Sequence, residues 1–163
     1  MTVPGALAGG VVGTVVLTTS LRAAQELGLT RMDIPLLLGT VFTANRSRAN
    51  LIGYALHFVN GLLFALLYAA VFAAVGEASW WFGALLGLAH GSFAGGALVN
   101  VLLPAVHPRM GTPWSDSGET PLLEPPGLFL ENYGPRTALG NLAAHLAYGA
   151  IVGGFAAHLA GWT

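Results

Sequence analysis

The sequence predicts an all-α integral membrane protein, a bundle of four transmembrane helices made from two tandem helical hairpins. Charged residues make up only 8% of the chain and hydrophobic residues 55%, whereas soluble domains average about 25% charged residues. Four apolar stretches reach the roughly 20 residues that cross a bilayer core. Two pairs of segments also resemble each other, in the order that a duplicated hairpin requires. We therefore expect a helical bundle surrounded by the lipid bilayer.

The predicted transmembrane helices occupy residues 4–21, 50–75, 79–103 and 138–160. The N-terminal stretch lacks the basic segment of a signal peptide, so we expect it to be retained as the first helix. Residues 33–44 are apolar but too short to span, which predicts a short interfacial helix that begins at Asp33. Seven of the nine prolines lie in residues 104–135, and this enrichment predicts an irregular loop. The whole chain, residues 1–163, is expected to form a single transmembrane domain.

All six cationic side chains are arginines, and they flank or occupy the first and third connections: Arg22, Arg31, Arg46, Arg48, Arg109 and Arg136. With four spans, these two connections lie on the same side of the membrane. The positive-inside rule predicts that this side is cytoplasmic and that both termini are outside. We therefore expect a multi-pass protein of the bacterial cytoplasmic (inner) membrane.

Composition excludes several classes of function. A net charge of −1 with six scattered arginines offers no basic stripe for nucleic acid, so no nucleic-acid partner is expected. The absence of cysteine excludes disulfides, thiolate metal sites and thiol nucleophiles. Ser92 lies near His90 but has no acidic residue within reach by sequence, so a hydrolytic triad is not expected. We expect a binding role rather than enzymatic turnover.

An internal repeat is the most specific pattern in the chain. Residues 48–61, RANLIGYALHFVNG, align without a gap with residues 136–149, RTALGNLAAHLAYG, and share an arginine, a leucine, an alanine, a histidine and a glycine. Residues 5–14, GALAGGVVGT, align in the same way with residues 83–92, GALLGLAHGS. Two hairpins that insert in the same direction are related by a pseudo-two-fold axis along the membrane normal. The sequence therefore predicts a parallel repeat.

Glycines at four-residue spacing predict where the helices touch, because small residues let helix backbones approach closely in a membrane. They lie on the first, third and fourth predicted helices: Gly5, Gly9 and Gly13; Gly83, Gly87, Gly91 and Gly95; Gly149 and Gly153.

Three histidines are expected inside the membrane, on three different helices. At 1.5 Å per residue, His57 and His145 lie roughly 13 Å inside the cytoplasmic boundary and His90 roughly 20 Å inside. On two of these helices, polar residues one turn from the histidine share its face. Buried polar and ionisable groups are costly in a bilayer, so these faces must turn inward. The sequence thus predicts an intramembrane cluster with polar supporting residues: His57, His90 and His145, with Asn60, Asn141 and Tyr148.

Convergent imidazoles predict a metal-binding site, because imidazole binds zinc, copper, iron and nickel. A haem b with His57 and His145 as axial ligands is the other form of this hypothesis, since Gly61 and Gly149 would leave room for a flat macrocycle. No local ligand motif such as HExxH identifies the metal. One alternative is a scaffold subunit of a larger membrane complex, or a homo-oligomer, in which the histidines are hydrogen-bonding glue between helices. A second alternative is a proton or small-solute pathway.

The chain resembles small, uncharacterised four-helix bacterial membrane proteins of families without an assigned function. The resemblance lies in four segments: GALAGGVVGTVVLT, LGLTRMDIPLLLGTVF, YALHFVNGLLFALLYA and GPRTALGNLAAHLAYGAIVGG. It spans nearly the whole chain and implies the four-helix fold. It implies no activity, cofactor, partner or site residue.

Overall fold

The computed structural model describes residues 3–111 and 123–159. Four helical stretches in these ranges are long and apolar enough to cross a membrane: Val3–Glu26, Arg46–Val75, Trp80–Val106 and Thr137–His158. The described residues are helical apart from turns, short connections and an isolated backbone pairing of Met110 with Leu123. The predicted all-helical class and the four long apolar helices are therefore confirmed.

The first, second and fourth stretches are the single helices α1 (Val3–Glu26), α3 (Arg46–Val75) and α6 (Thr137–His158). The third is continuous but changes type along its length, from α4 (Trp80–Phe93) through the π-helix η1 (Ala94–Leu102) to α5 (Leu103–Val106). Two short helices lie in the connections, α2 (Ile34–Thr40) and the 3₁₀-helix η2 (Leu128–Tyr133).

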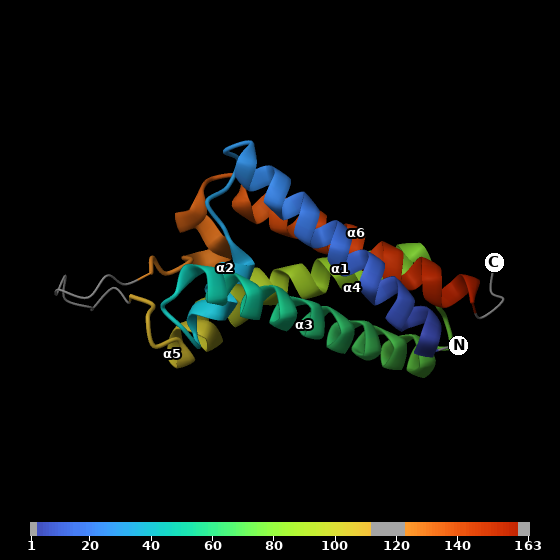
Figure 1. Ribbon diagram of the computed structural model, residues 1–163. Helices are drawn as coiled ribbons and strands as arrows, with labels where there is room; N and C mark the ends of the chain where they lie inside the picture. The colour runs from blue at the N-terminus through green and yellow to red at the C-terminus, as the bar shows by residue number, and fades with distance from the viewer. Residues whose placement is uncertain (1–2, 112–122, 160–163) are drawn as a thin grey trace.

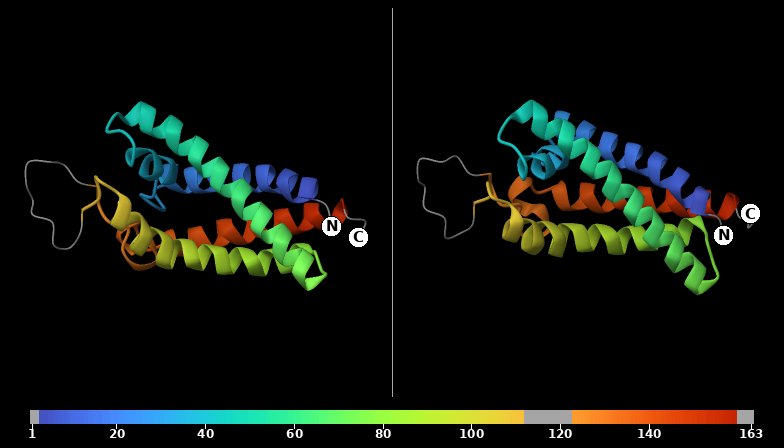
Figure 2. Two further views of the ribbon diagram at one scale, coloured as in Figure 1. Left: turned by 90° about the horizontal axis from the view of Figure 1, so that it is seen from below. Right: turned by 60° about the horizontal axis from the view of Figure 1, so that its bottom comes forward.

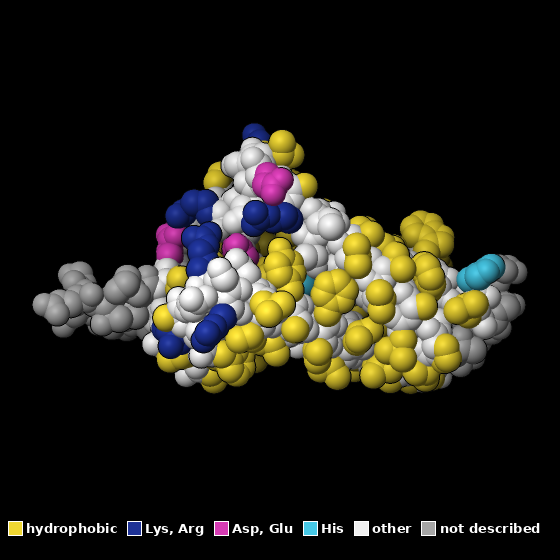
Figure 3. Space-filling model, in the orientation of Figure 1, with side chains coloured by type: hydrophobic (Ala, Val, Ile, Leu, Met, Phe, Trp, Pro, Cys, Tyr) yellow, Lys and Arg dark blue, Asp and Glu magenta, His cyan; other side chains and the backbone are white. Residues whose placement is uncertain are grey.

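The two ends of the bundle differ in charge. α1 begins and α6 ends at one end, and α2 and α5 lie at the opposite end (Figure 1). Basic side chains gather at that opposite end, whereas hydrophobic side chains cover the flank of the helices (Figure 3). We call the end with the basic side chains the arginine end and define it by its six arginines: Arg22, Arg31, Arg46, Arg48, Arg109 and Arg136. The exposed apolar flank includes Leu51, Leu63 and Leu67 of α3, as expected for helices in lipid.

Local sequence explains where the long helices begin and end. The side chain of Asn45 accepts a hydrogen bond from the backbone N–H of Arg48 at 3.0 Å, which caps α3 four residues before the predicted start. At the other end, Gly76 ends α3 with a φ of 77°, a conformation that favours glycine. The Ser79 hydroxyl then caps α4 by accepting from the N–H of Phe82 at 3.3 Å.

Glycines hold α4 and α6 in backbone contact, as their spacing predicts. A Cβ on Gly83 would meet the carbonyl of Gly149, and a Cβ on Gly87 would lie 2.9 Å from the carbonyl carbon of His145. α1 packs on the other side of α6, where a Cβ on Gly9 would lie 2.9 Å from the Cα of Val152. α6 is therefore the central helix of the bundle, between α1 and α4.

α3 approaches α4 through aromatic side chains and not through small residues. Phe72 meets Phe82 with ring centroids 5.6 Å apart, and Phe64 stacks on His90 at 3.6 Å. α3 meets the third span at the termini end and diverges from it toward the arginine end (Figure 2). A pseudo-two-fold axis would place α3 against α4 as closely as α1 lies against α6. In the structure, however, α3 packs along α1 and α2. The tandem duplication therefore stays a prediction.

α2 closes the arginine end of the bundle. Asp33 Oδ1 accepts from the N–H of Leu36 at 3.0 Å, which confirms the predicted cap, but α2 ends at Thr40 rather than at residue 44. His107 and Arg109, from the connection after α5, hold its last turn. His107 Nε2 lies 3.1 Å from the carbonyl oxygen of Leu37, and Arg109 Nη1 donates to the carbonyl of Thr40 at 2.7 Å.

The predicted irregular loop, 104–135, contains regular structure at both of its ends. Its first residues complete α5, and its last residues form η2, in which the N–H of Leu130 donates to the carbonyl of Gly127 at 2.9 Å. Residues 112–122 of this loop lie outside the described part of the chain. Near η2, Tyr133 donates its hydroxyl to the carbonyl of Glu124 at 2.8 Å, and burial raises the pKa of Tyr133 to about 12. The phenol therefore stays neutral and anchors this segment.

Candidate ligand-binding cavity

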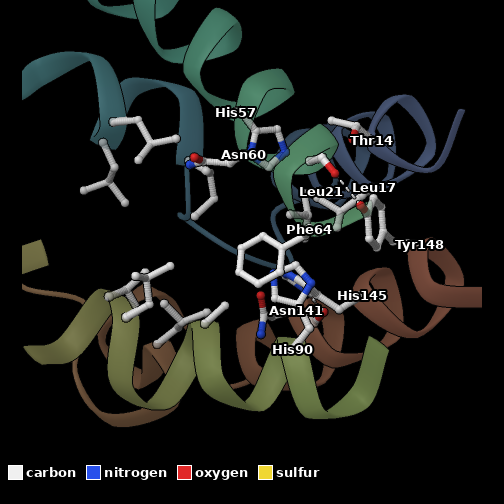
Figure 4. Close-up of a pocket in the computed structure, with 18 of the residues that line it drawn as sticks. Thr14, Leu17, Leu21, His57, Asn60, Phe64, His90, Asn141, His145 and Tyr148 are labelled. Carbon is white, nitrogen blue, oxygen red and sulfur yellow. Dashed lines mark hydrogen bonds between the residues drawn. The ribbon is translucent and has the colours of Figure 1, made fainter. Parts of the chain in front are cut away.

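A cavity of about 90 Å³ lies inside the bundle, where α3 diverges from the third span. α1, α3, α6 and the third span (α4, η1 and α5) form its walls, while α2 and η2 close it toward the arginine end. The described residues that line it carry no Asp, Glu, Lys or Arg. Aliphatic, aromatic and polar side chains line it together, and Leu17 and Leu21 lie near Thr14 and Tyr148 (Figure 4). An uncharged cavity with this mixed lining can hold a ligand with an apolar and a polar part.

His90 of α4 and His145 of α6 meet in the wall of the cavity. Their ring centroids are 4.7 Å apart and the rings are close to perpendicular, with an interplanar angle of 79°. His145 Nδ1 lies 2.8 Å from the carbonyl oxygen of Asn141, an acceptor, so Nδ1 carries the hydrogen and Nε2 keeps a lone pair. His90 Nδ1 lies 3.3 Å from the Tyr68 hydroxyl. Both rings are thus oriented through Nδ1, which leaves both Nε2 atoms without a protein hydrogen bond in the described residues.

The histidine pair forms because α6 lies so close to the third span. Gly91 has no side chain, and a Cβ there would lie 2.9 Å from the Cβ of His145. Asn141 Nδ2 donates to the carbonyl oxygen of Gly91 at 2.9 Å, which fixes the two helices in register at the level of the histidines. A buried asparagine that bonds a helix carbonyl is a common contact between membrane helices.

His57 lines the same cavity from α3 but stands apart from the other two histidines. The Phe64 ring, about two turns further along α3, lies between His57 and the pair in the view of Figure 4. Across residues 3–111 and 123–159, no group of three His, Asp or Glu side chains is placed to hold a metal ion. The structure therefore brings His90 and His145 together and leaves His57 on the opposite wall.

The three predicted supporting residues all line the cavity. Asn141 and Tyr148 lie next to His145, and the Tyr148 hydroxyl donates to the carbonyl of Gly61 at 2.5 Å. Asn60 lies with His57 on α3 (Figure 4). Sequence reasoning did not assign Tyr68 as the partner of His90, although its place one turn after Phe64 on the same helix face is a signal that could have found it.

The π-helix η1 widens the third span beside the cavity. Ala94, Leu98, Val99 and Leu103 face the cavity at spacings of four and five residues, as the looser winding of a π-helix requires. Leu130 of η2 reaches the same wall and is only 1% exposed. No sequence pattern predicted either contribution, because a π-helix has the same apolar composition as an α-helix and Leu130 lies in a segment expected to be a loop.

Comparison with family models, with curated proteins and with solved structures finds no match to this chain.

Proposed function

We propose that this membrane protein binds a transition-metal ion through His90 and His145, inside the bilayer. The observation that carries the proposal is the fixed tautomer of His145, whose Nδ1–H is held by the Asn141 carbonyl. Metal-binding histidines usually donate their second ring N–H to a carbonyl or carboxylate in this way, which orients the ring and directs Nε2 to the metal. Two imidazoles leave coordination positions open for water or for a ligand from the cavity.

Cavity size favours an ion over a haem. A single water molecule needs about 10–15 Å³ of cavity volume, so a cavity of about 90 Å³ accommodates a hydrated ion or a small organic group. A haem macrocycle is much larger and would require α3 to move away from the third span. His57, on the opposite wall, could supply the second axial ligand of a haem only after that movement. Haem binding is thus the second form of the proposal.

Metal analysis and the visible spectrum of the detergent-purified protein test the proposal. We expect a stoichiometric transition metal, and we expect His90→Ala and His145→Ala each to reduce the bound metal to about a tenth or less, since removal of a ligand costs at least as much affinity as removal of an orienting partner. Added cobalt(II) should give a visible spectrum with the wild-type chain. A Soret band in place of these signals would identify the haem form.

His158→Ala is the matched control, because His158 is an exposed histidine at the end of the same helix as His145. It should keep the full metal content. A wild-type protein that is folded, colourless and metal-free, and that takes up no cobalt, would contradict the proposal and would favour a scaffold role. Helicity by circular dichroism shows whether each variant is folded.

We also propose that the arginine end faces the cytoplasm, because positively charged connections are retained on that side. The chain has no cysteine, so single cysteines report topology directly. In intact bacterial cells, a membrane-impermeant maleimide should label Glu77→Cys, in the short turn between α3 and α4, and should spare Ser47→Cys at the arginine end. Both cysteines should react after the cells are opened. The reverse pattern would contradict the orientation.

A further inference from the structure

Asn60 lies in the hydrophobic part of the bundle, exposed beside the cavity, and has no hydrogen-bond partner among the residues that the structure describes. It lies 14 residues after the first residue of α3, or roughly 20 Å along the helix axis. Its side chain lines the cavity and makes no hydrogen bond to any other residue that the structure describes, and the same holds for His57 one turn earlier. Hydrocarbon offers no hydrogen bonds, so polar side chains at this depth normally find partners within the protein.

Most of the remaining lining is aliphatic. It comes from α1, α2, η2 and the third span and includes these side chains: Leu17, Leu21, Ile34, Leu37, Leu38, Leu98, Val99, Leu103 and Leu130. A molecule in the cavity thus meets hydrogen-bonding groups of α3, α4 and α6 together with apolar surface from the other elements. With no charged residue in the described lining, an ionised head group would find no counter-ion.

We infer that the cavity binds a neutral, single-chain amphiphile from the bilayer, whose head group carries carbonyl oxygens. The Asn60 amide and the His57 ring donate hydrogen bonds to these oxygens. The aliphatic side chains of the lining receive the first part of the chain. This site does not require a metal at His90 and His145, so the inference extends beyond the proposed function.

A pair of matched probes tests the inference on full-length protein that has been stripped of metal with a chelator. The neutral probe is a decyl-substituted benzoquinone, and the charged probe is decanoate at a pH where it is ionised. We expect saturable binding of the quinone by calorimetry, with a rise in the melting temperature, and no saturable binding of decanoate. Asn60→Leu should weaken quinone binding about tenfold, because the head group then lacks a hydrogen bond in an apolar site.

Two controls separate damage to the site from damage to the fold. Val59→Leu changes the neighbouring exposed residue on α3 and should bind the quinone normally. Leu98→Trp fills the cavity from η1 and should also reduce binding about tenfold, while Val101→Trp, on the exposed face of the same helix, should not.

Equal binding of quinone by wild type and Asn60→Leu, equal binding of both probes, or no binding of quinone would overturn the inference. Metal binding is measured separately, so the two proposals fail independently. A chain that takes up metal but no quinone contradicts the amphiphile site alone. A chain that binds quinone but never metal contradicts the metal site alone.

Discussion

Gly149→Ala should strongly destabilise the bundle, although alanine is the best helix-forming residue. A Cβ at Gly149 would collide with the carbonyl oxygen of Gly83 and would lie 2.9 Å from the Cα and the backbone nitrogen of Gly87. These are backbone atoms, so no side-chain rotation relieves the clash and α4 must move away from α6. Overpacking of this kind costs about 1–3 kcal/mol. Close packing is what holds these helices together, because lipid tails are as apolar as the helix surfaces and no hydrophobic driving force favours helix association in a membrane.

Gly140→Ala is the control, because it makes the same substitution on the same helix. A Cβ at Gly140 meets nothing within 4 Å, so the only effect is the gain in helix propensity of up to about 1 kcal/mol. The two variants should thus change the free energy of unfolding in opposite directions. Titration of the purified protein from mild detergent into sodium dodecyl sulfate, followed by circular dichroism, measures both. Equal stability of the two variants would show that α4 and α6 are not in backbone contact.

In Gly149→Ala, the movement of α4 away from α6 should also disturb the candidate site. His90 lies one turn after Gly87 on α4, and His145 lies one turn before Gly149 on α6, so movement at the glycines separates the two rings. Metal content of the Gly149→Ala protein is therefore expected to fall together with stability. In Gly140→Ala it should be unchanged.

Hydropathy and glycine spacing predicted most of the fold, because both depend on local composition. Hydropathy located the apolar part of each long helix but not its polar continuation. α1 runs to Glu26, five residues beyond the predicted end, because Arg22, Gln25 and Glu26 favour helix while facing water. The π-helix η1 left no trace in the sequence, since it is a change in hydrogen-bond register and not in residue type.

Only part of the candidate site could be predicted from the sequence, because the distances between helices were missing. Helix periodicity gives the direction in which a side chain points around its own helix, but not the distance between two helices. Small residues set that distance between α4 and α6 and bring His90 to His145. Between α3 and α4 it is set by Phe64, whose ring stacks on His90 and keeps α3 at a greater separation. Equivalent depths of His57 and His145 were therefore not sufficient to predict contact.

The second large effect is expected from Gly53→Val, which should disturb the packing of α2 on α3. A Cβ at Gly53 of α3 would strike the carbonyl of Pro35 and lie 2.8 Å from its Cα, so Gly53→Val should push the first turn of α2 off α3. Because Leu37 and Leu38 of α2 form part of the cavity wall, this movement opens the cavity toward the arginine end. A destabilisation of about 1.4 kcal/mol or more would raise the population of the open form about tenfold.

Leu37→Cys provides the measurement, because Leu37 is 6% exposed and the chain has no other cysteine. In the otherwise unchanged protein, a water-soluble maleimide should modify this thiol slowly. Adding Gly53→Val should accelerate the reaction about tenfold, whereas Leu51→Val, at an exposed position of α3, should leave the rate unchanged. His107 and Arg109 hold only the last turn of α2, so they cannot substitute for the packing of Pro35 on Gly53 at its first turn. An unchanged rate would mean that the packing of Pro35 on Gly53 does not hold α2 in place.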